Sequence, residues 1–190
     1  MKSLNIVMGI LFLSIFLSPQ AQAAKDKERD RTAAIEAYLA EFCSLQEQSM
    51  IFTAIKNVLR KMPYKDFLNV TNRRRPVLFV EVYDSGTARF ASSQEFIVSK
   101  NDPPCCQEGF TLIKLGGALE ESQDNVAIAG VVAHELAHRV LEHIKKGKVS
   151  CKSEREANRL IKRWGFEKEF AAASKAFGHR KGDPVSCQDK

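Results

Sequence analysis

The stretch "AGVVAHELAHRVLEH", residues 129–143, decides what fold to expect, because it sets polar residues into an apolar helical pattern. His134 and His138 are four residues apart, and Glu135 directly follows the first of them. In a helix, residues i and i+4 lie on one side, ~5–6 Å apart at Cβ. Both imidazoles can therefore reach one zinc ion at ~2.0–2.1 Å, with Glu135 placed beside them to act on water as a general base.

The competing interpretation is a core helix that happens to carry polar side chains. The residues before the motif, "VAIAGVVA" at 126–133, are small and apolar, as a buried helix requires. Two histidines and a glutamate within such a run would be costly to bury without a partner. The pattern therefore favours the zinc interpretation.

A catalytic zinc also needs a third protein ligand and one open position. The metzincin pattern H-E-x-x-H-x-x-G-x-x-H does not supply that ligand, because Leu141 stands where it has Gly and Ile144 where it has its last His. His143 lies five residues after His138 and, on a continuous helix, is expected to point elsewhere. The third ligand is therefore expected from a separate element.

The segment "SEREANRLIKRWGF", residues 153–166, predicts the helix that supplies this ligand. Glu154 and Asn158 are four residues apart, so both can face the first helix. Glu154 would bind zinc, and Asn158 could accept a hydrogen bond from a ligand histidine. Glu156 would point away. The alternative is a solvated, charged helix face without a metal.

At these residues the sequence resembles the gluzincin zinc metallopeptidases of the HtpX and CAAX-prenyl-endopeptidase family. "TLIKLGGALEESQDNVAIAGVVAHELAHRVLEH" (111–143) is similar to that family's strand, link and HExxH helix, including a further histidine at the position of His143. "EREAN" (154–158) is similar to its E-x-x-A-D motif, with Asn158 in place of the acid. The resemblance covers about residues 75–170, and the two motifs also resemble those of the ImmA/IrrE-like peptidases.

The resemblance implies a zincin-like fold with His134, His138 and Glu154 as zinc ligands and Glu135 as the general base. Members of the family use a downstream His or Arg to stabilise the oxyanion of the tetrahedral intermediate. His179, in "GHRKGDP", is the candidate for that catalytic role. The alternative interpretation is that His179 is an exposed loop histidine without a catalytic role.

Apolar periodicity along the rest of the chain predicts helices followed by strands and then helices again. The expected helices are 32–61, 124–146 with Gly147 as its C-terminal cap, 153–164 with Ser153 as its candidate N-cap and Gly165 as its break, and about 167–177. The expected strands are 77–83, 88–90, "EFIVS" (95–99) and "GFTLIKL" (109–115). This order predicts one α+β domain over residues 32–190 with a small, mainly antiparallel sheet. One of the last two strands is expected to border the cleft, where an extended peptide could add to the sheet.

The first 23 residues have the pattern of a secretory signal peptide. Lys2 is followed by an apolar run at 4–17 and by small residues at Ala21 and Ala23, which predicts cleavage after Ala23. The run is shorter than the ~20 residues that span a bilayer, so an uncleaved anchor is the less favoured alternative. Residues 24–31 form a charged leader. The sequence thus predicts an exported protein, periplasmic or secreted.

The net charge limits the classes of binding partner to expect. The formal net charge is +6, with one dense basic cluster at 73–75. Because export argues against nucleic acid, the basic residues are interpreted as a solvated surface, compatible with peripheral contact with an anionic envelope.

All five cysteines follow the predicted signal peptide; they are Cys43, Cys105, Cys106, Cys151 and Cys187. In an exported protein this number predicts two disulfides and one free thiol, and the sequence leaves their pairing open.

Together these patterns predict an exported zinc-dependent endopeptidase that cleaves envelope or extracellular proteins or peptides, with Zn²⁺ as cofactor. The alternative is a catalytically weak or inactive zincin-fold protein with a binding or chaperone-like role in the envelope, which Asn158 would suit. A disulfide-stapled basic surface-binding protein without metal is a weaker third hypothesis. The presence of Glu135 favours the enzyme, because a purely structural zinc site has no use for a general base.

Overall fold

The computed structural model describes residues 19–82, 90–97, 108–144 and 150–178, with side chains from residue 30 onward. Within these ranges the chain is α+β, with seven helices and three strands. In chain order they are α1 (Pro19–Phe42), α2 (Met50–Lys61), α3 (Tyr64–Val70), β1 (Val77–Val82), β2 (Ala91–Phe96), β3 (Phe110–Gly116), α4 (Ala118–Glu121), α5 (Asn125–Val140), α6 (Cys151–Arg163) and α7 (Glu167–Phe177).

The sheet is mixed, with the strand order β1-β3-β2, so the expectation of a mainly antiparallel sheet was wrong. β1 and β3 run parallel, with Val77 opposite Thr111, whereas β2 and β3 run antiparallel, with Ser93 opposite Ile113. After β2 the chain returns to the middle of the sheet instead of adding at its edge. Because β3 lies between β2 and β1, it pairs with both, antiparallel with β2 and parallel with β1.

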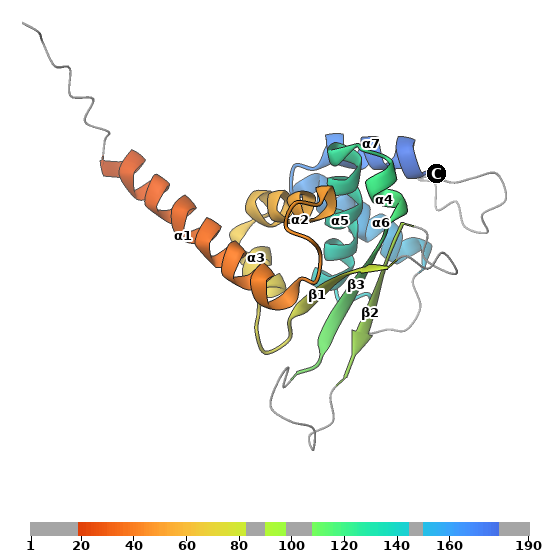
Figure 1. The fold of residues 1–190 in the computed structure, drawn as a ribbon, viewed down its shortest axis with the longest axis horizontal. Helices are drawn as coiled ribbons and strands as arrows, with labels where there is room; N and C mark the ends of the chain where they lie inside the picture. Colours follow the sequence, from red (N-terminus) through yellow and green to blue (C-terminus); the bar gives the residue numbers. More distant parts are fainter. Residues whose placement is uncertain (1–18, 83–89, 98–107, 145–149, 179–190) are drawn as a thin grey trace, which may run out of the picture.

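One face of the sheet is buried beneath the helices. Val77 and Phe79 of β1 and Ile113 and Leu115 of β3 are fully buried, while the residues that alternate with them are partly exposed. Such alternation is expected when one face of a sheet packs on the core. Figure 1 shows the helices gathered beside the sheet, with the first half of α1 extending away from them.

α5 is the central helix of the molecule and packs against α2, α3, α6, α7 and β2 (Figure 1). Its side toward α7 requires a residue without a side chain. A Cβ built on Gly130 would lie 2.2 Å from the carbonyl oxygen of Glu169. Gly130 therefore allows the backbones of α5 and α7 to approach closely.

The helix expected over 32–61 is interrupted and forms the separate helices α1 and α2. The Ser49 hydroxyl accepts a hydrogen bond from the Phe52 N–H at 3.0 Å. Glu120 on α4 accepts a second one from the Ile51 N–H at 2.9 Å. Because these carboxylate and hydroxyl oxygens satisfy free N–H groups, a new helix can begin at Met50.

The helix that carries the histidine motif also ends earlier than expected, at Val140 instead of Lys146, and Gly147 lies outside the described residues. Glu142 adopts a left-handed backbone conformation with φ 55°. The N–H of Glu142 bonds to the Arg139 carbonyl at 3.2 Å, and that of His143 to the His138 carbonyl at 3.1 Å. This is the Schellman arrangement, here with Glu142 where glycine is usual.

The N-cap of the following helix lies three residues before the expected one, Ser153. Ser150 is the N-cap of α6, and its hydroxyl accepts from the Ser153 N–H at 3.2 Å. The Ser153 hydroxyl in turn accepts from the Ser150 N–H at 2.7 Å. Ser153 is therefore the second half of a capping box and not the cap itself. The helix ends beside Gly165, as expected, where φ is +81°.

Some of the remaining predicted elements agree with the structure, and others begin elsewhere or lie outside the described residues. β1, β3 and α7 match their predicted spans closely, but β2 begins in the polar segment "ASSQ", four residues before the expected 95–99. Most of the strand expected at 88–90 lies outside the described residues, as do residues 1–18 of the predicted signal peptide. The predicted leader 24–31 is helical and belongs to α1. None of the helices in the described part of the chain is long and apolar enough to cross a membrane.

A buried cluster of charges joins the sheet to the end of α5. The Arg75 guanidinium, 10% exposed, pairs with Glu95 on β2 and, at 2.8 Å, with Glu142. Arg139 donates to the Arg75 backbone carbonyl at 3.1 Å and to Asn69 at 3.2 Å. Arg75 thus holds both the strand beside α5 and the left-handed residue that ends it.

We expect Arg75→Met to lower the free energy of unfolding by ~3–5 kcal/mol, because the buried carboxylate of Glu95 loses its partner. Arg73→Met provides a matched control, since Arg73 pairs with Glu41 on the surface at 65% exposure. Its expected cost is ~0–1 kcal/mol. Urea denaturation of both variants measures the difference, and equal stability of the two would contradict the role assigned to Arg75.

Candidate metal centre

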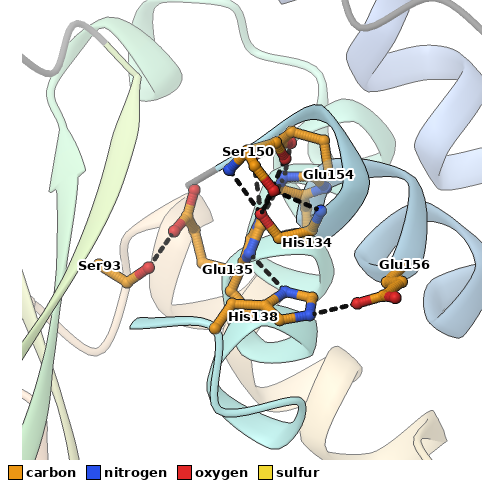
Figure 2. A network of polar contacts seen from close by, with 9 residues as sticks. Ser93, His134, Glu135, His138, Ser150, Glu154 and Glu156 are labelled. Atoms are coloured by element: carbon orange, nitrogen blue, oxygen red, sulfur yellow. Dashed lines mark hydrogen bonds and ion pairs between the residues drawn. The ribbon is translucent and has the colours of Figure 1, made fainter. Parts of the chain in front are cut away.

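Two helices bring three potential metal ligands to one point. His134 and His138 lie on one side of α5, and Glu154 lies in the first turn of α6. The Nε2 atoms of the two histidines are 3.0 Å apart. Glu154 places Oε2 3.0 Å from Nε2 of His134 and Oε1 3.3 Å from Nε2 of His138. Figure 2 shows His134 and Glu154 turned toward each other between the helices.

These separations fit the coordination of a small divalent ion. Ligand atoms bound to zinc at ~2.0–2.1 Å with tetrahedral angles lie about 3.3–3.4 Å from one another. The distances among the three side chains, 3.0 to 3.3 Å, are close to that value. Two imidazoles and one carboxylate are also the donor types that zinc accepts. His134, His138 and Glu154 could therefore hold such an ion without rearrangement of the backbone.

The charges of the site keep the carboxylate ionised. Burial alone would raise the pKa of Glu154, but its hydrogen bonds and charge interactions with His134 and His138 hold that pKa far below its usual range. Burial lowers the pKa of His134, yet the contact with Glu154 and the charges of Glu135 and Glu154 outweigh it, so the net pKa is raised. Glu154 is thus ionised, as a carboxylate that binds a metal must be.

Burial is uneven across the three side chains. His138 is 4% exposed, whereas His134 is 22% and Glu154 27% exposed. The His138 side is closed by protein, and the side formed by His134 and Glu154 is open. An ion held here would keep an accessible position for water or for a substrate group, as catalytic sites do and structural sites do not.

Asn158 lies near His134, as expected from its position one turn after Glu154. Its contact with His134 contributes to the raised pKa of that histidine. The Asn158 Oδ1 atom is buried, and no hydrogen bond of good geometry reaches it. A histidine that binds a metal through Nε2 carries its proton on Nδ1 and needs an acceptor there. The unsatisfied Asn158 oxygen is therefore suited to a metal-bound His134.

Glu135 faces away from Glu154, toward the sheet. The Ser93 hydroxyl on β2 donates a hydrogen bond of 2.6 Å to Oε2 of Glu135 (Figure 2). Ser93 was not singled out from the sequence, because its position opposite α5 depends on how the sheet packs and not on a local pattern. The hydrogen bond fixes the carboxylate between the edge strand and the candidate ligands.

His143 and Glu156, expected to point elsewhere, lie behind His138, one of the two candidate ligand histidines. Nδ1 of His143 is 3.1 Å from Nδ1 of His138, and Nε2 of His143 is 3.0 Å from Oε2 of Glu156. The expectation for His143 was wrong because it assumed a continuous helix, whereas α5 ends at Val140. Contact with His143 and the charges of Lys152 and Arg159 outweigh desolvation and lower the pKa of Glu156.

Several predicted residues lie outside the described ranges or away from this centre. His179 is outside the described residues, together with Cys105, Cys106 and Cys187. Cys151 is disulfide-bonded. Cys43 is a free thiol, and burial raises its pKa. The number and pairing of the disulfides stay predictions.

Comparison of the chain with protein-family models, curated proteins and solved structures finds no match. The functional interpretation therefore rests on the two sequence motifs and on the geometry of this centre.

Replacing the carboxylate that completes the centre tests its ability to bind metal. We expect Glu154→Gln to weaken Zn²⁺ binding by more than the ~10–100-fold typical of losing a partner behind a ligand, because a ligand itself is lost. Glu121→Gln, an exposed change on α4 with the same loss of charge, should bind as the wild type does. Metal analysis after gel filtration and isothermal titration calorimetry measure both, and equal affinity of the two variants would contradict the assignment.

Proposed function

We propose that this chain is an exported zinc-dependent endopeptidase of the gluzincin type. His134, His138 and Glu154 would hold the zinc, and Glu135 would act as the general base. The observation that carries the proposal is the convergence of three candidate ligand side chains, whose nearest nitrogen and oxygen atoms are 3.0 to 3.3 Å apart. The charge of the neighbouring Glu135 carboxylate acts on His134. The open side of the site, formed by His134 and Glu154, supports a catalytic role over a structural one.

In the proposed peptide hydrolysis, Glu135 would accept one proton from water and return it to the leaving group. Zinc, when bound here, would lower the pKa of water and polarise the peptide carbonyl. The Glu135 carboxylate accepts a proton from the attacking water as the new carbon–oxygen bond forms. It then gives that proton to the leaving nitrogen as the carbon–nitrogen bond breaks. The hydrogen bond from Ser93 holds Glu135 toward β2, the strand along which we place the substrate.

The edge of the sheet supports an extended peptide as the substrate. Among the described strands, β2 pairs with β3 alone, so its other edge has no strand partner. An extended chain could add there by backbone hydrogen bonds. Ser93 places this strand at Glu135, so a peptide bound to β2 would pass the candidate general base. The predicted signal peptide points to envelope or extracellular proteins as targets.

Asn158 favours a second function, that of a binding protein with weak or no peptidase activity. Asn158 is neutral and does not close a good hydrogen bond to His134, so the centre has less support on this side than a carboxylate would give. A zincin-like protein with weak or no activity would then serve as a binding or chaperone-like factor. Peptide cleavage, not metal content, separates this alternative from the peptidase.

We expect Glu135→Gln to retain bound zinc but to lower peptide cleavage by ~10²–10⁴-fold, because the isosteric amide accepts no proton. The substrates are fluorescently labelled denatured casein and a random peptide library read by mass spectrometry. The control is Glu121→Gln, which makes the same chemical change away from the centre.

Cleavage that survives in Glu135→Gln at the wild-type rate would contradict the proposed mechanism. A wild-type chain that binds one zinc but cleaves none of these substrates would favour the binding protein.

A further inference from the structure

The side of the centre that is closed by protein contains a chain of polar contacts behind His138. His138 is 4% exposed and His143 5% exposed, and Glu156 at the end of the chain is 34% exposed. The contacts run from Nε2 of His138, at the candidate metal position, through Nδ1 of His138 to His143 and then to Glu156. The peptidase chemistry proposed above uses neither His143 nor Glu156.

The way in which α5 ends creates the first contact of this chain. In the Schellman arrangement, the second residue after the cap returns against the third-last residue of the helix. Those two positions are His143 and His138, which the backbone bond at 3.1 Å also joins. Glu142 must adopt φ 55° for this turn, a conformation that is unfavourable for residues with a side chain. The pairing of Glu142 with the buried Arg75 helps to hold it there.

The hydrogen bonds allow one arrangement of protons when His138 binds a metal. His138 must present the lone pair of Nε2, so its proton lies on Nδ1 and is donated to Nδ1 of His143. His143 then carries its own proton on Nε2, where the Glu156 carboxylate accepts it. Each donor therefore meets an acceptor along the contacts of 3.1 and 3.0 Å.

The opposite ligand histidine has a weaker partner. His134 lies near the neutral amide of Asn158, whose buried oxygen has no hydrogen bond of good geometry. A carboxylate behind a ligand histidine orients the ring and raises its basicity, which an amide does less well. In this chain the carboxylate, Glu156, lies on the His138 side and contacts His138 through His143.

We propose that Glu156 and His143 are positioning residues that fix the tautomer and ring orientation of His138 and thereby strengthen metal binding at the centre. This inference rests on the proposed zinc site, but it assigns a role to two residues outside the ligand set. It also gives the left-handed turn at Glu142 a function, because that turn brings His143 against His138.

The test measures the Zn²⁺ dissociation constant of the full chain by competition with a chromophoric chelator. We expect Glu156→Gln to weaken binding ~10–100-fold, as the loss of a partner behind a ligand does. Glu121→Gln is the charge-matched control and should leave the constant unchanged. Thermal unfolding of the metal-free chains should be equal for Glu156→Gln and the wild type, which separates a positioning role from a loss of fold.

A double-mutant cycle tests whether the two residues act as one chain. His143→Asn keeps an acceptor near Nδ1 of His138 but cuts the link to Glu156. We therefore expect Glu156→Gln to have no further effect on zinc affinity in the His143→Asn background. The Co²⁺-substituted protein should show the same shift of its visible absorption bands in both single variants and in the double variant.

The outcomes are distinguishable. A wild type that binds zinc, together with a Glu156→Gln variant of unchanged affinity and unchanged Co²⁺ spectrum, would overturn the positioning role and leave the proposed zinc site intact. Additive losses in the double variant would also overturn it. A wild type that binds no zinc would overturn both proposals.

Discussion

The burial of α5 is the constraint on which the rest of this structure depends. The helix is enclosed by four helices and the sheet, yet it carries His134, Glu135, His138 and Arg139 within its last two turns. Polar groups in such a position are costly unless each has a partner. The neighbouring elements supply these partners: Ser93 for Glu135, Glu154 for the two candidate ligand histidines, and the Arg75 carbonyl with Asn69 for Arg139. The packing of the core and the assembly of the candidate metal centre therefore have the same physical cause.

Two helix ends determine which side chains meet at the centre. The left-handed Glu142 ends α5 and returns His143 against His138, and the capping box of Ser150 and Ser153 starts α6 so that Glu154 lies in its first turn. A carboxylate in the first turn is favoured by the helix dipole, in addition to its contacts with the histidines. Arg75 connects the first of these ends to β2, which also carries Ser93. The edge strand β2 is thus tied to α5 at two points, through Arg75 to the residue that ends the helix and through Ser93 to the candidate general base.

The sequence was sufficient for the residues whose relation is local. His134 and His138 share one helical turn, as do Glu154 and Asn158, so a period of 3.6 residues places each pair correctly. The rest depended on where elements end and on which segments pack together. His143 was misplaced because a non-glycine residue at a left-handed position gives little signal of a helix end, and Ser93 lay in a polar segment without the apolar alternation of a strand. The parallel pairing of β1 with β3 is set by tertiary packing, which local propensity does not encode.

X-ray absorption at the zinc edge of the zinc-loaded full chain tests the central claim, that two imidazoles and one carboxylate form a metal centre. Our account predicts one zinc per chain with a shell of nitrogen and oxygen atoms at ~2.0–2.1 Å and multiple-scattering features of two imidazoles. In Glu154→Gln the zinc should be lost or its shell altered. A sulfur shell at ~2.3 Å would place the metal on cysteines, and a chain without zinc after loading would remove the centre altogether; either result would contradict the account.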